Sequence, residues 1–336
     1  MIFQIIFFNI IIFSFVYFVC KKFQILQDKV ELFNHKKFVD VKKEKYAVGG
    51  ISIFLALILL ENTNQTIIIL SSLFILIGII SDLDLVKNPI VRLLVQIIFS
   101  FFVTYYIDLK INYTNVFFID YLIQYNLWNT IFTIFCLIVL INGTNFIDGI
   151  NTLASGYYLI ISIIIYYLSN QYGYSLNFQF LEIIIASLFV FVLFNIFGLM
   201  ILGDSGSYFL SFLLGIILIN FANQNTQIAP LFIVNLLWYP AFENLFTIIR
   251  RKFSSKSKVS EPDTSHLHQM ILSFLKNKNE NSNTVSGIFI LSFNSIFFIF
   301  SLFNHTHTKN LLSILIIQII IYLGVYFFLK KRLSLK

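Results

Sequence analysis

Residues 2–20, IFQIIFFNIIIFSFVYFVC, form an apolar stretch without a single charged side chain. About 20 apolar residues in a helix cross the roughly 30 Å hydrocarbon core of a bilayer. Similar stretches recur along the 336-residue chain, which is 58% hydrophobic and only 12% charged, whereas soluble domains carry about 25% charged residues. These stretches are continuously apolar rather than alternating, which indicates membrane-spanning helices and not a barrel.

The sequence therefore predicts an all-α integral membrane protein, a polytopic bundle of about ten or eleven transmembrane helices. We place eleven helices at residues 2–20, 48–60, 66–81, 93–107, 129–142, 153–168, 179–197, 206–222, 228–248, 284–303 and 310–329. No repeat or low-complexity linker divides the chain, so we predict one domain over residues 1–336. Residues 2–20 lack a signal peptide's basic leader and cleavage site, and we interpret them as a retained helix.

The basic residues are distributed unevenly between the loops. All Lys and Arg side chains except Lys110 and Lys309 fall in one alternating set of loops, at 21–47, 82–92, 249–283 and 330–336. The positive-inside rule places this set in the cytoplasm, the N-terminus outside and the C-terminus inside, as in a multi-pass protein of the bacterial inner membrane. Topology and anionic lipid headgroups account for the net charge of +7, so we expect no nucleic-acid partner.

Five acidic side chains lie near the cytoplasmic ends of predicted helices that are far apart in the sequence. They are Asp82, Asp84, Asp148, Asp204 and Glu243. Any one of them alone fits a solvated charge at a helix end. Acids at membrane depth are costly, however, and those that occur usually line a functional cavity. The set therefore predicts an acidic site facing the cytoplasm.

The segment 142–156, NGTNFIDGINTLASG, is densely polar although it lies between two apolar helices. Asn142, Asn145, Asn151 and Asp148 all need hydrogen-bond partners this close to lipid, because an unsatisfied polar group there is destabilising. A plain connecting loop does not need so many polar groups. The segment therefore favours ligand binding.

Residues 203–207, GDSGS, open the helix predicted from residue 206. Glycines allow close backbone approach, and the free N–H groups at a helix start attract phosphate, although Asp and Ser are also ordinary N-caps. Together with Asp148, Asp204 suggests magnesium held by carboxylates beside a diphosphate, with manganese as a substitute.

The long cytoplasmic loop carries Arg250-Arg251-Lys252 and then His266 and His268. The basic cluster also fits the positive-inside signal alone. Zinc is disfavoured because no second Cys/His pair follows at ligand spacing, so the histidines fit anion contact or proton transfer better. His305 and His307 lie in a short outer loop, and we assign them no role in the site.

The sequence resembles the polyprenyl-phosphate N-acetylhexosamine-1-phosphate transferases, membrane enzymes that include the phospho-MurNAc-pentapeptide transferases. The resemblance covers residues 49–268, and the motif region extends over about 48–270. The motifs stand in the family's order and comprise Gly49-Gly50-Ile51, residues 78–82 with Arg92 and Gln96, residues 142–149, residues 203–207, Pro240 with Glu243 and Arg251, and His266-Leu267-His268.

Three positions depart from the family's pattern. Ser81 stands where the family usually has the first Asp of an Asp-Asp pair, Asn151 stands for a second acid, and Gln269 stands for the last histidine of a His-Leu-His-His run. The main acids remain, and a specialised subgroup is the simplest explanation. Any mechanism that needs the first Asp of the pair does not apply unchanged.

The resemblance implies a magnesium-dependent transfer of N-acetylhexosamine 1-phosphate from a UDP-sugar to undecaprenyl phosphate. UMP would leave, and the product would begin a lipid-linked cell-envelope polysaccharide. The implied partners are UDP-N-acetylhexosamine, undecaprenyl phosphate, membrane lipid and a second copy of the chain in a homodimer. GlcNAc, GalNAc, QuiNAc and FucNAc donors all fit, and a pentapeptide donor fits less well.

The resemblance also implies roles for individual residues. The expected catalytic residues are Asp82, Asp84, Asp148, His266 and His268. The expected substrate-binding residues are Asn142, Asn145, Asn151, Ser205, Arg251 and Lys87. The expected metal ligands are Asp204 and Asp148.

The main alternative is a transporter or flippase in which acids and amides couple ions to substrate movement. The acids cluster at one face instead of at the midplane, and no pair of interrupted hydrophobic segments recurs in two halves. The residue pattern therefore favours the enzyme.

Overall fold

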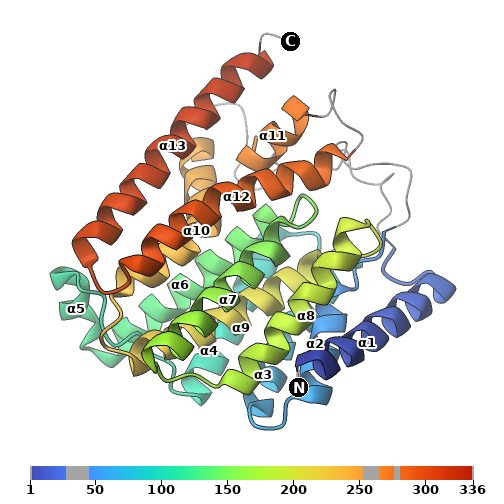
Figure 1. Cartoon of the computed structure of the whole chain (residues 1–336), viewed down its shortest axis with the longest axis horizontal. Helices are drawn as coiled ribbons and strands as arrows, with labels where there is room; N and C mark the ends of the chain where they lie inside the picture. The colour runs from blue at the N-terminus through green and yellow to red at the C-terminus, as the bar shows by residue number, and fades with distance from the viewer. Residues whose placement is uncertain (1, 28–44, 253–264, 276–280, 335–336) are drawn as a thin grey trace.

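The computed structural model describes residues 2–27, 45–252, 265–275 and 281–334, and these residues are almost entirely helical. The helices run side by side as one bundle (Figure 1). Their bounds are α1 Ile2–Phe23, α2 Gly49–Leu60, α3 Gln65–Asp82, α4 Pro89–Tyr106, α5 Phe117–Ile123, α6 Asn126–Ile147, α7 Leu153–Tyr172, α8 Phe178–Ile196, α9 Gly203–Gln224, α10 Pro230–Lys252, α11 Leu267–Leu275, α12 Ser282–Phe303 and α13 Thr308–Ser334.

The predicted fold class is confirmed. In the described part of the chain, 10 helices are long and apolar enough to cross a membrane, and the 12-residue α2 is a shorter apolar helix. Each of the eleven predicted helices corresponds to one of the observed helices, leaving only α5 and α11 unpredicted. Both are too short to stand out as apolar stretches, with 7 and 9 residues.

Two helix boundaries differ from the prediction in a way that matters for the site. Helix α6 continues to Ile147, so most of the polar segment that we expected in a loop is helical. The side chains of Asn142 and Thr144 donate to the carbonyls of Ile138 and Leu140 in their own helix, at 3.0 and 2.8 Å. This internal bonding satisfies part of the polar segment without a loop. Helix α9 begins at Gly203, three residues earlier than predicted.

Helix α9 is central to the bundle, and glycines allow two helices to approach its first turn. A Cβ atom on Gly50 of α2 would lie 2.3 Å from Cα of Gly206, and one on Gly78 of α3 would lie 2.1 Å from Cα of Ser205. Neither position has room for a side chain. The glycines therefore fix α2 and α3 against the start of α9, and bring the C-terminal end of α3 beside it.

Loops that the charge pattern assigned to one side contact each other. At one end of the bundle, the N–H of Ile201 donates to the carbonyl of Tyr46 at 2.9 Å. At the other end, the N–H of Ala229 donates to the carbonyl of His305 at 2.9 Å. The start of α1 and the end of α13 lie at opposite ends of the bundle (Figure 1). The side that faces the cytoplasm and the assignment of a single domain stay predictions.

His305 has a structural place at the outer end of the bundle as defined by the charge pattern. Its ring is buried, with Nε2 2.8 Å from the hydroxyl of Tyr174 and Nδ1 2.8 Å from the carbonyl of Leu302. The contact joins the α12–α13 turn to the segment between α7 and α8. His307, by contrast, is exposed.

Candidate active site

The carboxylate of Asp204, in the first turn of α9, is the centre of a polar cluster built from four helices. Its Oδ2 accepts from the Ser81 hydroxyl of α3 at 2.5 Å and lies 3.1 Å from Nη1 of Arg92 on α4. Its Oδ1 accepts from the Asn145 amide of α6 at 2.6 Å. Tyr208, one turn along α9, donates to Oδ2 at 3.4 Å.

The Asp204–Arg92 pair lies in the partly exposed part of this cluster. The side chains of Asp204 and Arg92 are 26% and 28% exposed, while Ser81 is buried. The same Nη1 of Arg92 donates to the Ser81 hydroxyl at 2.5 Å. One positive and one negative group thus meet at the open side of the cluster, where an anionic ligand and a cation can both be held.

Asp82 caps the start of α9 from another helix. Its two carboxylate oxygens accept from the backbone N–H groups of Asp204 at 2.9 Å and Ser205 at 3.1 Å. These N–H groups belong to the first turn of a helix and have no partner within it. A negative charge at this position is also favoured by the helix dipole. Asp82 therefore fixes the backbone that carries Asp204.

Asn142 lies one turn before Asn145 on α6 and extends the cluster along α4. Its amide donates to Oε1 of Gln96 at 3.0 Å. Gln96 is fully buried, one turn after Arg92. This hydrogen bond joins α4 to α6 and sets the position of Arg92 relative to Asn145.

A second cluster surrounds Glu243 of α10. The Glu243 Oε1 atom lies 2.9 Å from Nδ1 of His266, and Oε2 accepts from the Tyr322 hydroxyl of α13 at 2.6 Å. Glu243, His266 and Tyr322 are all buried. The rings of His266 and His268 are stacked, with centroids 5.4 Å apart. The late loop histidines are thus fixed against the bundle at the start of α11.

The last turn of α6 touches both clusters through successive residues. Asn145 bonds Asp204, and the ring of Phe146 lies 5.1 Å from the ring of His266. Just beyond, a Cβ on Gly149 would lie 2.7 Å from Nε2 of His268. The polar segment that we singled out in the sequence therefore joins the two clusters.

Other predicted site residues lie around this centre. Asp148 is the C-cap of α6, and Arg251 lies in the last turn of α10. The backbone N–H of Asn151 donates to Oδ1 of Asn283 at 2.6 Å, which fixes the turn after α6 to the start of α12. The structure thus places Asn151 against α12.

Three further predicted site residues, Ser205, Asp84 and Lys87, lie near the Asp204 cluster in the sequence. Ser205 is fully buried under Gly78 of α3, so its side chain lies in the helix packing and not at the open side of the site. Substrate contact by Ser205 stays a prediction. Asp84 has a left-handed backbone with a φ of 58° and is half-buried, and Lys87 is exposed. Both lie in the α3–α4 loop beside Asp82.

Several residues in the two clusters had no assigned role. Arg92, Gln96, Glu243 and Ser81 stood in the motifs, and an arginine near the start of an apolar helix is a signal in itself. Tyr208 and Tyr322 carried no such signal. A tyrosine in an apolar stretch is usually a core residue, and Tyr322 lies 79 positions after Glu243 in the sequence.

The donor set fits magnesium better than a metal that needs several protein ligands. Among the described residues, no group of three or more His, Cys, Asp and Glu side chains is arranged to hold a metal. Magnesium usually takes one or two carboxylates and completes its shell with water and substrate phosphate oxygens. Asp204, partly exposed and beside the Asn145 amide, matches that pattern.

Comparisons with known proteins show a family model and two relatives that this chain resembles. A model of glycosyl transferase family 4 matches residues 64–222. A Bacillus subtilis protein named probable undecaprenyl-phosphate N-acetylglucosaminyl 1-phosphate transferase is 26% identical over 236 residues, 68% of this chain and 65% of its own length. A Thermotoga maritima protein named undecaprenyl-phosphate alpha-N-acetylglucosaminyl 1-phosphate transferase is 28% identical over 227 residues, 66% of each chain. Both matches thus cover slightly less than two thirds of the relative's length.

Proposed function

We propose that the chain, whose residues 64–222 match a model of glycosyl transferase family 4, transfers a sugar 1-phosphate from a UDP-N-acetylhexosamine to undecaprenyl phosphate and releases UMP. Both relatives are named as N-acetylglucosaminyl 1-phosphate transferases, so UDP-GlcNAc is the first donor to test. The reaction would take place at the cytoplasmic face of the bacterial inner membrane. A homodimer stays a prediction.

The observation that carries this proposal is the convergence of Ser81, Arg92, Asn145 and Asp204 from four helices on one partly exposed point. A transfer between two phosphate groups brings two anions together and needs positive charge and precise positioning more than a strong base. The cluster offers a carboxylate, a guanidinium and an amide at the end of the bundle. A lipid acceptor can reach that end from the bilayer.

Asp204 and Asn145 would hold a magnesium ion, with Asp148 as a predicted second carboxylate. When bound, this ion would neutralise charge on the diphosphate oxygens during transfer.

Other residues of the chain would bind the substrates or position the groups that bind them. Arg92 would hold a substrate phosphate, because a guanidinium binds phosphate oxygens through two parallel hydrogen bonds. Asp82 would keep the first turn of α9 in place through its two backbone hydrogen bonds. We predicted from the sequence that Asp82 is catalytic; we propose that it acts on the lipid phosphate, and its double contact adds a positioning role.

His266, held by Glu243, and His268 would face the donor's diphosphate or sugar from the start of α11. In the reaction, an oxygen of the lipid phosphate bonds to the phosphorus that carries the sugar. The bond from that phosphorus to UMP breaks, and UMP takes the electron pair. The atom balance is the same whether transfer takes one displacement or two.

The test uses membranes that contain the protein, undecaprenyl phosphate, magnesium and UDP-GlcNAc labelled in the sugar. Label entering the organic phase with an equal release of UMP, lost with EDTA and reversed by added UMP, is the expected result. The Asp204→Asn variant should lose turnover, and the His307→Ala variant, changed at an exposed outer residue, should keep it. Release of UDP, or no transfer from any UDP-N-acetylhexosamine by folded protein, would overturn the proposal.

A further inference from the structure

Helix α10 contains a proline in its interior, and this proline leaves a carbonyl group without its normal partner. Pro240 has no N–H, so it cannot donate to the carbonyl of Leu236 four residues earlier. Leu236 is fully buried, and neither lipid nor the protein core offers water to such a group. The carbonyl needs a donor from outside the helix.

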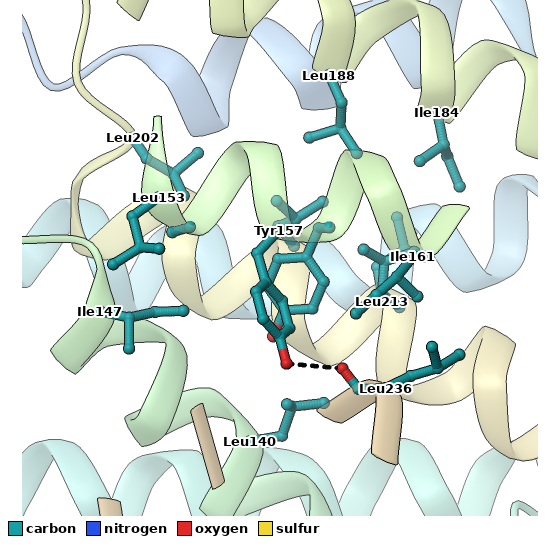
Figure 2. Close-up of a cluster of buried hydrophobic side chains, with 14 of the residues drawn as sticks. Leu140, Ile147, Leu153, Tyr157, Ile161, Ile184, Leu188, Leu202, Leu213 and Leu236 are labelled. Carbon is teal, nitrogen blue, oxygen red and sulfur yellow. Dashed lines mark hydrogen bonds between the residues drawn. The ribbon is translucent and has the colours of Figure 1, made fainter. Parts of the chain in front are cut away.

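Tyr157 of α7 supplies that donor. Its hydroxyl donates to the Leu236 carbonyl at 2.8 Å, as Figure 2 shows. The same hydroxyl accepts from the backbone N–H of Tyr239 at 3.4 Å. Tyr157 is fully buried among leucine and isoleucine side chains, and its hydroxyl bonds the backbone of α10 there. It replaces the backbone hydrogen bond that the proline removes.

The contact lies just before the Glu243 cluster. Glu243 follows Pro240 by three residues, within the next turn of α10, and holds both His266 and Tyr322. On the other side, a Cβ on Gly143 would lie 2.1 Å from the carbonyl oxygen of Pro240, so α6 touches the same point. Because an interior proline bends a helix, the direction of α10 beyond residue 240 depends on what holds this point.

We propose that Tyr157 is a positioning residue, which fixes the part of α10 beyond Pro240 and through it the Glu243–His266 pair. Its effect on transfer rests on the proposed function, because His266 is there assigned to the donor. Its effect on the helix does not. Tyr157 touches no reacting group in this proposal and acts only through Glu243.

The test is a double-mutant cycle with Tyr157→Phe and Pro240→Ala. Alanine at position 240 restores an N–H that can donate to the Leu236 carbonyl, so the Tyr157 hydroxyl becomes dispensable for helix stability. The control is Tyr166→Phe on the same helix, whose hydroxyl bonds Glu182 at 2.9 Å far from α10. It removes an equivalent hydroxyl without touching the proline.

The first readout needs no substrate. Tyr157→Phe should lower the thermal unfolding temperature clearly and raise hydrogen exchange across residues 241–252. The same substitution in the Pro240→Ala background should do neither, and Tyr166→Phe should leave exchange in 241–252 unchanged. Equal effects of Tyr157→Phe in both backgrounds would overturn the proposed link between hydroxyl and proline.

The second readout is transfer kinetics. A misplacement of about 1 Å can change rates by up to about 100-fold. We expect Tyr157→Phe to raise the KM for the UDP-sugar about tenfold or more, and to change the KM for undecaprenyl phosphate by a smaller factor. The double variant should regain thermal stability and still show the raised KM, because its helix lacks the proline bend. Normal kinetics in a destabilised Tyr157→Phe variant would overturn the positioning role. If the parent protein transfers no sugar phosphate, the proposed function fails, and the cycle of unfolding and exchange still decides the link between Tyr157 and Pro240.

Discussion

Replacing Asp82 by asparagine tests whether this carboxylate stabilises the start of α9. The carboxylate accepts two backbone N–H groups, at 2.9 and 3.1 Å. An asparagine has the same shape but only one acceptor atom, so its NH₂ group would face one of these N–H groups. We expect the substitution to lower both the stability of the fold and the rate of transfer.

The magnitude follows from the two lost interactions. A buried donor left without a partner costs about 1–3 kcal/mol. Loss of a negative charge at a helix N-terminus costs about 0.3–1 kcal/mol. The sum is about 1.3–4 kcal/mol, which corresponds to a fall in Tm of about 3–8 °C at a slope of about 2 °C per kcal/mol.

The assay is thermal unfolding of the detergent-solubilised protein, followed by the fluorescence of the buried Trp238. The control is Asp84→Asn, two residues away in the α3–α4 loop and half-buried, where Asn also tolerates the left-handed backbone; it should change Tm by less than about 1 °C. An Asp82→Asn protein with the parent's Tm would refute the reasoning from the two backbone hydrogen bonds. Loss of transfer with an unchanged Tm would then assign Asp82 to the chemistry alone.

The other predictions concern the two clusters and their support. Arg92→Gln should lower kcat/KM about 10- to 100-fold, because a charged hydrogen bond to phosphate contributes about 1.5–3 kcal/mol. The control Lys309→Gln should leave kcat/KM unchanged, and an equal loss in both variants would contradict a local role of Arg92. Gly78→Ala should destabilise the protein by about 1–3 kcal/mol or more in the same unfolding assay, because its methyl group would lie 2.1 Å from the α9 backbone. Normal stability of this variant would mean that α3 can move aside. Glu243→Gln should raise the KM for the UDP-sugar about tenfold, because it weakens the hold on His266, and a change confined to the lipid substrate's KM would reverse that assignment.

The sequence alone was sufficient to predict the helices and the region in which the candidate site residues lie. An apolar stretch near residues 66–81 or 129–142 must be a helix in lipid, so an acid next to such a stretch lies near the end of a helix. Hydropathy gives the length of a helix, but it does not determine its rotation about its axis or its neighbours. For that reason the sequence could not show that Asp82 contacts the backbone of α9 or that Tyr322 contacts Glu243.

Polar residues near helix ends caused the main boundary errors. We ended the helix near residue 142 where the polar side chains begin, but Asn142 and Thr144 bond within α6, and the helix continues to Ile147. The close approach of Gly78 to Ser205 could not be predicted either, because it depends on how two distant helices pack.

Asn145 and Phe146 are neighbours in the chain, and each contacts a different cluster. Successive residues of a helix point about 100° apart, so the last turn of α6 cannot rotate at one cluster without shifting at the other. If a ligand at Asp204 changes the angle of that turn, the stacking of His266 changes with it. Thermodynamic linkage then requires the reverse: a ligand on the His266 side alters affinity at Asp204 by the same factor. Two substrates bound on the two sides of α6 would therefore bind cooperatively, and the sign of that cooperativity would be measurable as a donor affinity that depends on the concentration of the lipid acceptor.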